Sequence, residues 1–259
     1  MIDALKCQIR SWERDSRYEW LTDAATFGWV SMNNLMDWTK IGRVTERLVH
    51  GDFPDDVDAA VSEVCLGSFG AGIRPMQVPT ELAGLISLID AKKPKSLLEI
   101  GTARGGTLLL ISRFAAADAT IVSVDLPYGR NGGGYPKWKD YYYRLFALPE
   151  QKLHLMRANS HDPATLECVR NALDGEQLDF ILIDGDHSYN GVKRDYENYR
   201  PLLAPGGILA LHDVLPNAVD PSIDVHRFWA ELVSDPSIKA DMIVDDPNQG
   251  MYGIGIIYG

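Results

Sequence analysis

Two short segments of the sequence place carboxylate and imidazole side chains directly after apolar runs. Asp184, Asp186 and His187 fall within four consecutive residues, and His212 and Asp213 form an adjacent pair further along the chain. Such groups activate a hydroxyl group in two ways, because a bound divalent cation lowers its pKa and orients it, while a histidine accepts its proton. The first segment alone provides for both, so we expect it to take part in catalysis.

Strand-like and helix-like segments alternate regularly from residue 95 onwards, and these elements must position the reactive side chains. The predicted strands are Ser96–Ile100, Thr120–Asp125, Leu153–Arg157, Phe180–Asp184, Ile208–His212, Ala240–Val244 and Tyr252–Tyr258. The predicted helices are Thr80–Ala91, Gly106–Ala117, Tyr141–Leu148, Pro163–Leu173, Gly191–Leu203 and Val225–Val233.

This alternation predicts an α/β fold with a doubly wound, mostly parallel, seven-stranded Rossmann-like sheet, because strands joined by helices pair through right-handed crossovers. Only a short segment joins the last two strands, which predicts a C-terminal antiparallel strand. We divide the chain into a helical N-terminal extension, residues 1–75, and a main domain, residues 76–259. Ligands of such sheets bind beyond the carboxyl ends of the strands, so the polar residues at five consecutive strand ends predict the active site there.

The turn after the first predicted strand, within SLLEIGTARGGT at residues 96–107, indicates a nucleotide-like cofactor. Its glycines permit close approach of the backbone, and the helix start offers free N–H groups. It departs from the GxGxxG turn of dinucleotide-binding proteins, because Ala103 stands where a pyrophosphate approaches most closely. Glu99 suits a cation rather than a phosphate, and Asp125 suits the hydroxyls of a ribose. A cationic, ribose-bearing cofactor without phosphate points to S-adenosyl-L-methionine.

The chain resembles the class I S-adenosylmethionine-dependent methyltransferases in three segments, LLEIGTARGGT, FILIDGDHSYNGV and LAPGGILALHDV. More narrowly, it is similar to the small-molecule O-methyltransferases that include macrolide-sugar O-methyltransferases and cephalosporin-hydroxylase-like proteins. The resemblance covers the region from residue 75 to residue 215. It implies cofactor contacts by Glu99, Gly101 and Thr102 at the methionine end, Asp125 at the ribose, Ser160 near the adenine, Gln77 above the cofactor, and Asp184 at the fourth strand end.

The same resemblance implies roles for the acidic segments. It assigns a metal ligand to Asp184, a general base to His187, and further metal ligands to His212 and Asp213. His212 departs from the acidic or acid–amide pair that is usual there. Because magnesium prefers oxygen ligands, an imidazole at this position favours manganese, iron or zinc. His212 could instead be a second catalytic base while His187 orients the substrate, and either aspartate could simply cap a turn.

These observations predict O-methylation of a hydroxyl group on a small organic molecule, such as a natural-product sugar or a phenol. The glycines and aromatic residues of Pro127–Lys139 suit a wall that covers such a ring. Two alternatives stay open. One is an NAD(P)-dependent oxidoreductase on the same sheet, which the incomplete glycine pattern and the lack of a Tyr-x-x-x-Lys pair disfavour. The other is a non-catalytic cofactor-binding partner of another enzyme.

The N-terminal extension contains four of the six tryptophans, at Trp12, Trp20, Trp29 and Trp38. The segment Leu35–Val49 has helical spacing of its apolar residues. Because exposed tryptophan surface needs covering, we expect the extension to be a lid or the subunit interface of a homo-oligomer.

The bulk composition excludes some partners and suggests a compartment. The formal net charge is −11, which argues against nucleic acid or an anionic membrane as the main partner. The N-terminus is too polar for a signal peptide, and no apolar run approaches the length of a membrane span, so we expect a cytoplasmic protein. The three cysteines are far apart and predict neither a disulfide framework nor a zinc site.

Overall fold

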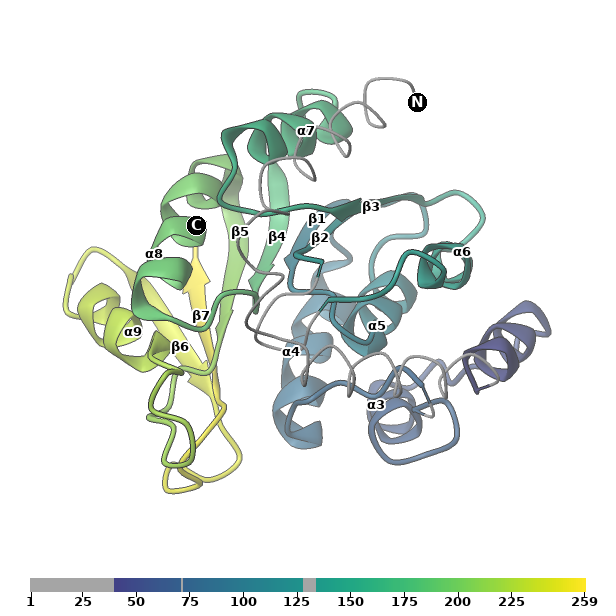
Figure 1. Ribbon diagram of the computed structural model, residues 1–259, viewed down its shortest axis with the longest axis horizontal. Helices are drawn as coiled ribbons and strands as arrows, with labels where there is room; N and C mark the ends of the chain where they lie inside the picture. The colour runs from purple at the N-terminus through teal and green to yellow at the C-terminus, as the bar shows by residue number, and fades with distance from the viewer. Residues whose placement is uncertain (1–39, 71, 128–133) are drawn as a thin grey trace, which may run out of the picture.

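The computed structural model describes residues 40–70, 72–127 and 134–259. Its centre is a seven-stranded sheet with the order β3-β2-β1-β4-β5-β7-β6 (Figure 1). The strands are β1 (Ser96–Ile100), β2 (Thr120–Asp125), β3 (Lys152–Arg157), β4 (Leu178–Ile183), β5 (Leu203–His212), β6 (Lys239–Ile243) and β7 (Ile254–Tyr258). The first five strands pair in parallel, whereas β7 runs antiparallel to β5 and to β6. The predicted mostly parallel α/β fold with an antiparallel C-terminal strand is confirmed.

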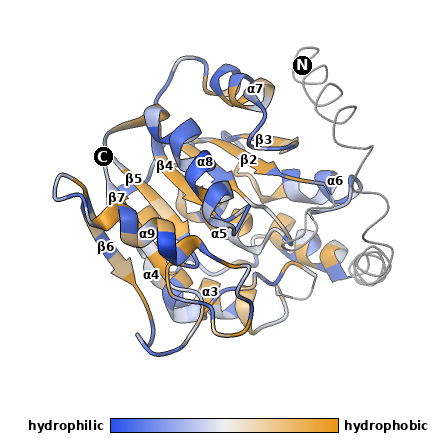
Figure 2. Ribbon diagram, turned by 60° about the vertical axis from the view of Figure 1, so that its left-hand side comes forward, coloured by the Kyte–Doolittle hydropathy of each residue, from blue (hydrophilic) through white to orange (hydrophobic). Residues whose placement is uncertain are grey.

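Helices cover both faces of this sheet. They are α3 (Val57–Cys65), α4 (Pro79–Lys92), α5 (Gly106–Phe114), α6 (Lys139–Tyr143), α7 (Pro163–Leu173), α8 (Tyr189–Tyr199) and α9 (Val225–Val233), with short 3₁₀ turns at Arg144–Phe146 and Arg200–Leu202. Successive residues of a strand point to opposite faces, so Leu97 and Leu98 of β1 belong to different clusters of buried side chains. The cluster of Leu97 includes residues of α4 and α5, and that of Leu98 includes residues of α7, α8 and α9. Figure 2 shows this layering, with apolar strands between helices that carry hydrophilic outer faces. None of the described helices is long and apolar enough to cross a membrane.

The structure corrects the predicted bounds of α8, the helix that follows the acidic segment. The prediction was Gly191–Leu203, but the helix begins two residues earlier because the Ser188 side chain accepts a hydrogen bond from Gly191 N and caps it. It ends before Pro201, which cannot continue the backbone hydrogen-bond pattern of an α-helix. Leu203 therefore belongs to β5 rather than to the helix.

The described part of the N-terminal extension packs into the main domain. Residues 40–49 are helical, and their buried side chains Ile41, Val44 and Leu48 share one apolar cluster with α3, α4 and α5. The four tryptophans of the extension lie outside the described residues, and so does the part of the predicted helix before residue 40. The assignment of a lid or a subunit interface therefore stays a prediction.

Cys65 is a buried free thiol.

Candidate active site

The turns after β1 and β4 lie side by side at the point where the strand order reverses. Asp184 N donates a hydrogen bond of 2.8 Å to Ile100 O, and Gly101 N donates one of 2.8 Å to Val124 O. Gly101 has a φ of +101°, and a Cβ at this position would lie 2.0 Å from the carbonyl oxygen of Asp184. The glycine is thus required by the close packing of the two turns, and not only by a cofactor as the sequence indicated.

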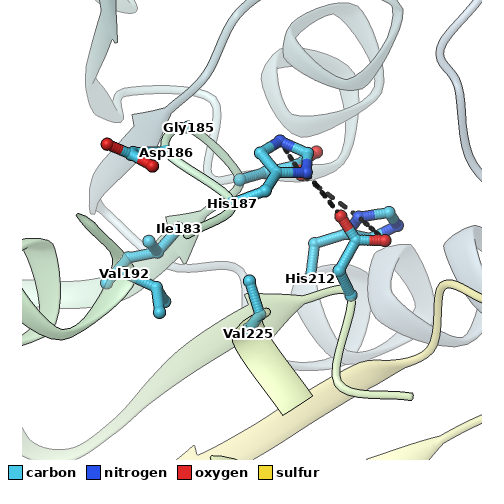
Figure 3. A pocket seen from close by; sticks show the side chains of 9 residues that line it. Ile183, Gly185, Asp186, His187, Val192, His212 and Val225 are labelled. Carbon is cyan, nitrogen blue, oxygen red and sulfur yellow. Dashed lines mark ion pairs between the residues drawn. The ribbon is translucent and has the colours of Figure 1, made fainter. Parts of the chain in front are cut away.

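Asp184, His187, His212 and Asp213 form one cluster at the ends of β4 and β5. The Nδ1 atom of His187 lies 2.6 Å from Asp213 Oδ2, and its Nε2 atom lies 3.7 Å from Asp184 Oδ1. The Nδ1 atom of His212 lies 3.1 Å from Asp184 Oδ1 and 3.5 Å from Asp213 Oδ1. Figure 3 shows these ion pairs, and it shows the Asp186 carboxylate pointing away from both histidines. The residues predicted for catalysis and metal binding are therefore together, and Asp186 is apart from them.

The electrostatics of this cluster follow from burial opposed by pairing. Burial lowers the pKa of His212, but Asp184 and Asp213 outweigh burial and raise the pKa well above its usual value. Burial also lowers the pKa of His187, but the neighbouring carboxylates of Asp213 and Asp184 outweigh burial and raise it overall. Burial raises the pKa of Asp213, but both histidines act more strongly and hold it well below the usual range. The pairing thus favours the protonated form of both histidines and the ionised form of Asp213.

Three of these side chains could hold a divalent cation. One ligand atom from each of Asp184, His212 and Asp213 lies within 4.8 Å of the other two. Within the described part of the chain, His212 Nε2 and Asp213 Oδ1 are buried and have no hydrogen-bond partner. Because buried polar atoms without partners are unfavourable, these atoms fit a role as metal ligands. A set of one imidazole and two carboxylates suits manganese, iron or zinc better than magnesium.

Glu99, on β1, shows the opposite electrostatic situation. Its Oε2 atom accepts a hydrogen bond of 2.6 Å from Ser123 Oγ, which lies 2.5 Å from Thr102 Oγ1. Its Oε1 atom is buried without a hydrogen-bond partner among the described residues. Burial raises the pKa of Glu99 to about 8, although the hydrogen bond from Ser123 lowers it. A nearby cation would stabilise the ionised carboxylate, so Glu99 fits the cationic end of a cofactor.

Asp125, at the end of β2, faces the turn after β1. Its Oδ2 atom accepts a hydrogen bond of 2.9 Å from Tyr135 N. Burial raises the pKa of Asp125 to about 6, and hydrogen bonds from the backbone of Tyr135, Ala103 and Thr102 partly offset this effect. The carboxylate is thus anchored to the predicted cofactor turn, which is compatible with its predicted role at the ribose.

Two other predicted residues differ in how closely they join the site. Gln77 Nε2 donates a hydrogen bond of 3.0 Å to Asp184 Oδ2, so Gln77 contacts the acidic cluster directly. Ser160 follows β3, and its carbonyl oxygen accepts a hydrogen bond of 2.9 Å from Tyr199 Oη. This contact fixes the turn to α8 but does not link Ser160 to a cofactor, so its place near the adenine stays a prediction.

Sequence reasoning missed two residues at this edge of the sheet. Ser123 is fully buried in β2 and links Thr102 to Glu99. A serine inside the apolar strand TIVSVD was the available signal. Tyr252 lies just before β7, with its ring centroid 5.8 Å from that of His212. No local pattern connects it to the site, because only the antiparallel pairing of β7 with β5 brings it there.

The same fold occurs in solved structures of O-methyltransferases. The O-methyltransferase of Bacillus cereus, in complex with S-adenosylhomocysteine, has a TM-score of 0.55 and 18% identity over 85% of this chain and 91% of that one. TomG of Streptomyces achromogenes, an O-methyltransferase involved in tomaymycin synthesis and solved with S-adenosylmethionine, has a TM-score of 0.51 and 17% identity over 79% of this chain and 90% of that one. The architecture is therefore the Rossmann-like fold of these enzymes.

The sequence comparison adds a family to this fold. Residues 98–214 match a family described as a methyltransferase domain. The curated protein y4gI of Sinorhizobium fredii is 26% identical over 150 residues, which make up 57% of this chain and 16% of that protein. The chain thus spans about one sixth of the length of this relative. The matched region contains both Glu99 and the cluster from Asp184 to Asp213, so the predicted resemblance to the methyltransferases is confirmed for this part of the chain.

Proposed function

We propose that the protein is an S-adenosylmethionine-dependent O-methyltransferase that acts on a hydroxyl group of a small organic molecule, a phenol or a natural-product sugar. The observation that carries this proposal is that a candidate cofactor site on β1 lies next to a candidate cation site at the ends of β4 and β5. The unpaired carboxylate oxygen of Glu99 suits a cationic cofactor, and the donor set of Asp184, His212 and Asp213 suits a divalent cation. Two enzymes of the same fold, solved with S-adenosylhomocysteine or S-adenosylmethionine, are O-methyltransferases, which supports the assignment.

The turn after β1 would bind the cofactor, which supplies an electrophilic methyl group when it is bound. Glu99, Gly101 and Thr102 would hold its methionine end, with Glu99 ionising next to the positive charge. Asp125 would accept hydrogen bonds from the ribose hydroxyls, and Ser160 would lie near the adenine. Gln77 and Asp184 are joined by a hydrogen bond and would close the site at the methyl end.

Asp184, His212 and Asp213 would hold a divalent cation, which lowers the pKa of a hydroxyl group when it is bound. Asp213 would also orient His187, because its Oδ2 atom lies 2.6 Å from Nδ1 of His187. A proton held on Nδ1 by this contact leaves Nε2 of His187 as the proton acceptor. His187 would then remove the proton from the acceptor hydroxyl, and Asp213 would stabilise the imidazolium that forms.

Calorimetry with S-adenosylhomocysteine tests this proposal most directly. We expect the full chain to bind S-adenosylhomocysteine in EDTA and to bind Mn²⁺ in a separate titration. NADH should not bind, which would remove the oxidoreductase alternative. Absence of S-adenosylhomocysteine binding would refute the proposal, whereas cofactor binding without methylation of any phenol or sugar in the presence of Mn²⁺ would favour a non-catalytic partner protein.

A further inference from the structure

Tyr252 has an unusual backbone conformation that its surroundings enforce. The described residues other than glycine with positive φ are Lys93, Ala103, Asp174, Asp213 and Tyr252. Lys93 and Asp174 end helices, where a left-handed residue is common. Ala103 lies in the proposed cofactor turn, and Asp213 is a proposed metal ligand. Tyr252, at +66°, ends no helix. Strained residues of this kind cluster at ligand sites.

Hydrogen bonds from two sides hold this conformation. Leu215 N donates a bond of 2.9 Å to Tyr252 O, which ties the residue to the segment directly after Asp213. On the other side, Gly253 N donates a bond of 3.1 Å to Glu81 Oε2. The backbone of Tyr252 is therefore fixed between β5 and α4, which are far apart in the sequence.

Glu81 is the centre of the second attachment. It is only 1% exposed, and its carboxylate also accepts hydrogen bonds from Asp245 N at 3.2 Å and from Gln249 Nε2 at 2.7 Å. All three donors belong to the connection between β6 and β7. A buried carboxylate with three donors from one loop holds the loop in a single position, and that position includes Tyr252.

The ring of Tyr252 borders the proposed cation site on the side away from the cofactor. It is tilted by 47° to the ring of His212 at a centroid distance of 5.8 Å. Glu99 and Asp125 lie on β1 and β2, on one side of β4 and β5, whereas β7 lies on the other side. The Tyr252 side chain is partly exposed, so it offers an aromatic surface next to the cation site and outside the cofactor half.

We propose that Tyr252 contacts the ring of an aromatic hydroxyl acceptor and that Glu81 is the positioning residue that holds Tyr252 there. This inference rests on the proposed function. A hydroxyl oxygen placed at His212 and Asp213 brings the carbon skeleton of its molecule within reach of the Tyr252 ring. A phenolic hydroxyl has an ordinary pKa of about 10, whereas an aliphatic hydroxyl resembles water at about 15.7. The phenol needs the smaller shift to ionise, and its flat ring packs well against tyrosine.

The test uses 4-nitrocatechol, a coloured phenol whose absorption changes when its hydroxyls ionise. The full chain is loaded with S-adenosylhomocysteine and Mn²⁺, each titrated first in the same series, and 4-nitrocatechol is then added. We expect Tyr252→Ala to weaken 4-nitrocatechol binding about 10-fold and Tyr252→Phe to stay within about 3-fold of wild type, because the contact is aromatic. Tyr258→Ala, at the far end of β7, is the matched control and should bind as wild type does.

Two further variants separate contact from folding. Tyr252→Gly should unfold about 2–4 °C above Tyr252→Ala, because glycine relieves the strain that alanine keeps. Gln249→Ala removes one donor to Glu81 and should weaken 4-nitrocatechol binding by a factor between those of Tyr252→Phe and Tyr252→Ala, with Mn²⁺ affinity unchanged.

Three results would overturn the inference: equal affinity of wild type and Tyr252→Ala for 4-nitrocatechol, no binding of it by the loaded wild type, or parallel loss of Mn²⁺ affinity in Tyr252→Ala. Failure of the wild type to bind S-adenosylhomocysteine or Mn²⁺ in the first titrations would instead remove the proposed function, and the inference with it.

Discussion

Two groups of carboxylates occupy the same edge of the sheet under opposite electrostatic conditions. The cofactor side consists of Glu99 and Asp125, where burial raises the pKa values to about 8 and about 6. The cation side consists of Asp184 and Asp213 with the two histidines, and there the pKa of Asp213 lies well below its usual range because both histidines act on it. Among the described residues, no positive side chain acts on Glu99 and only Arg157 acts on Asp125, whereas two histidines act on Asp213.

This difference indicates how each side responds to its ligand. A cation that binds beside Glu99 would supply a positive charge that no described side chain provides there, so ionisation of Glu99 and cofactor binding should be coupled. A metal ion that binds at Asp213 would instead compete with protons on the histidines, because metal ligands must be deprotonated. A mutation on one side should therefore weaken binding of that side's ligand and leave binding of the other ligand unchanged.

Replacement of the proposed base should have the largest effect. His187→Ala should lower turnover about 10²- to 10⁴-fold, the usual contribution of general base catalysis. S-adenosylhomocysteine affinity should change by less than about 3-fold, because His187 belongs to the cation side. The measurement is S-adenosylhomocysteine formed with Mn²⁺ and a panel of phenols and sugars. His154→Ala, a half-buried histidine on β3, is the control, and full turnover by His187→Ala would exclude it as the base.

Removal of a proposed ligand should abolish metal binding without affecting the cofactor side. Asp213→Asn should weaken Mn²⁺ binding by at least about 100-fold, beyond the range known for residues that only support ligands. Calorimetry with Mn²⁺ and with S-adenosylhomocysteine measures both sides in one protein. Asp186→Asn is the matched control, because this carboxylate accepts a bond from Ser188 N and points away from the cluster. Equal Mn²⁺ affinity of wild type and Asp213→Asn would show that Asp213 is not a metal ligand.

Replacement of Glu99 should have the opposite effect, because it should weaken cofactor binding and leave metal binding intact. Glu99→Gln should weaken S-adenosylmethionine binding about 10- to 100-fold, the loss expected for a charged hydrogen bond, while Mn²⁺ affinity stays unchanged.

The same variant should also change the pH dependence of stability. Burial raises the pKa of Glu99 from 4.5 to about 8, so the folded protein without ligand keeps a proton that the unfolded chain has lost between these values. Stability without ligand must then fall as pH rises across this window. Glu99→Gln cannot ionise and should lose that part of the slope in denaturant unfolding at several pH values. An unchanged slope would show that Glu99 is not protonated when folded.

The sequence predicted the fold, and it predicted that the acidic and histidine side chains lie together, because both features depend on patterns along the chain. Alternating apolar runs and helical segments determined the parallel sheet, and parallel strands carry their carboxyl ends to one edge. Asp184 and His187 follow β4, His212 is the last residue of β5, and Asp213 follows it. Because β4 and β5 are neighbours in the sheet, the strand order alone brings these four residues together. The bounds of α8 were less predictable, because they depend on one capping contact of Ser188 and on Pro201.

Residues whose role depends on contacts between distant segments could not be predicted. Tyr252 reaches His212 only through the antiparallel pairing of β7, and Glu81 holds it from a helix 171 positions earlier in the printed sequence. Gly101 also has a contact that the sequence did not predict. The glycine-containing turn indicated space for a ligand, but the atom nearest to a Cβ built on Gly101 is the carbonyl oxygen of Asp184.

Removal of the Ser123 hydroxyl, which donates a hydrogen bond to Glu99, should have the smallest effect on ligand binding. This variant tests most finely whether the charge of Glu99 controls cofactor binding. Ser123 Oγ donates a bond of 2.6 Å to Glu99 and lowers its pKa, opposing the effect of burial. Ser123→Ala should therefore raise the pKa of Glu99 further and weaken S-adenosylmethionine binding about 3- to 10-fold at pH 7.5, the scale of one hydrogen bond.

The pH profile of this variant distinguishes a charge effect from a packing effect. Binding of wild type should strengthen as pH rises towards the pKa of Glu99, about 8, and level off above it, because the cofactor binds the ionised carboxylate. Ser123→Ala should show the same curve displaced to higher pH, so its deficit should shrink in alkaline solution. Ser112→Ala, a buried serine whose hydroxyl donates to Leu108 O within α5, is the matched control and should follow the wild-type curve. A deficit that is equal at every pH would mean that Ser123 supports the cofactor side by shape alone, and that the charge of Glu99 does not control binding.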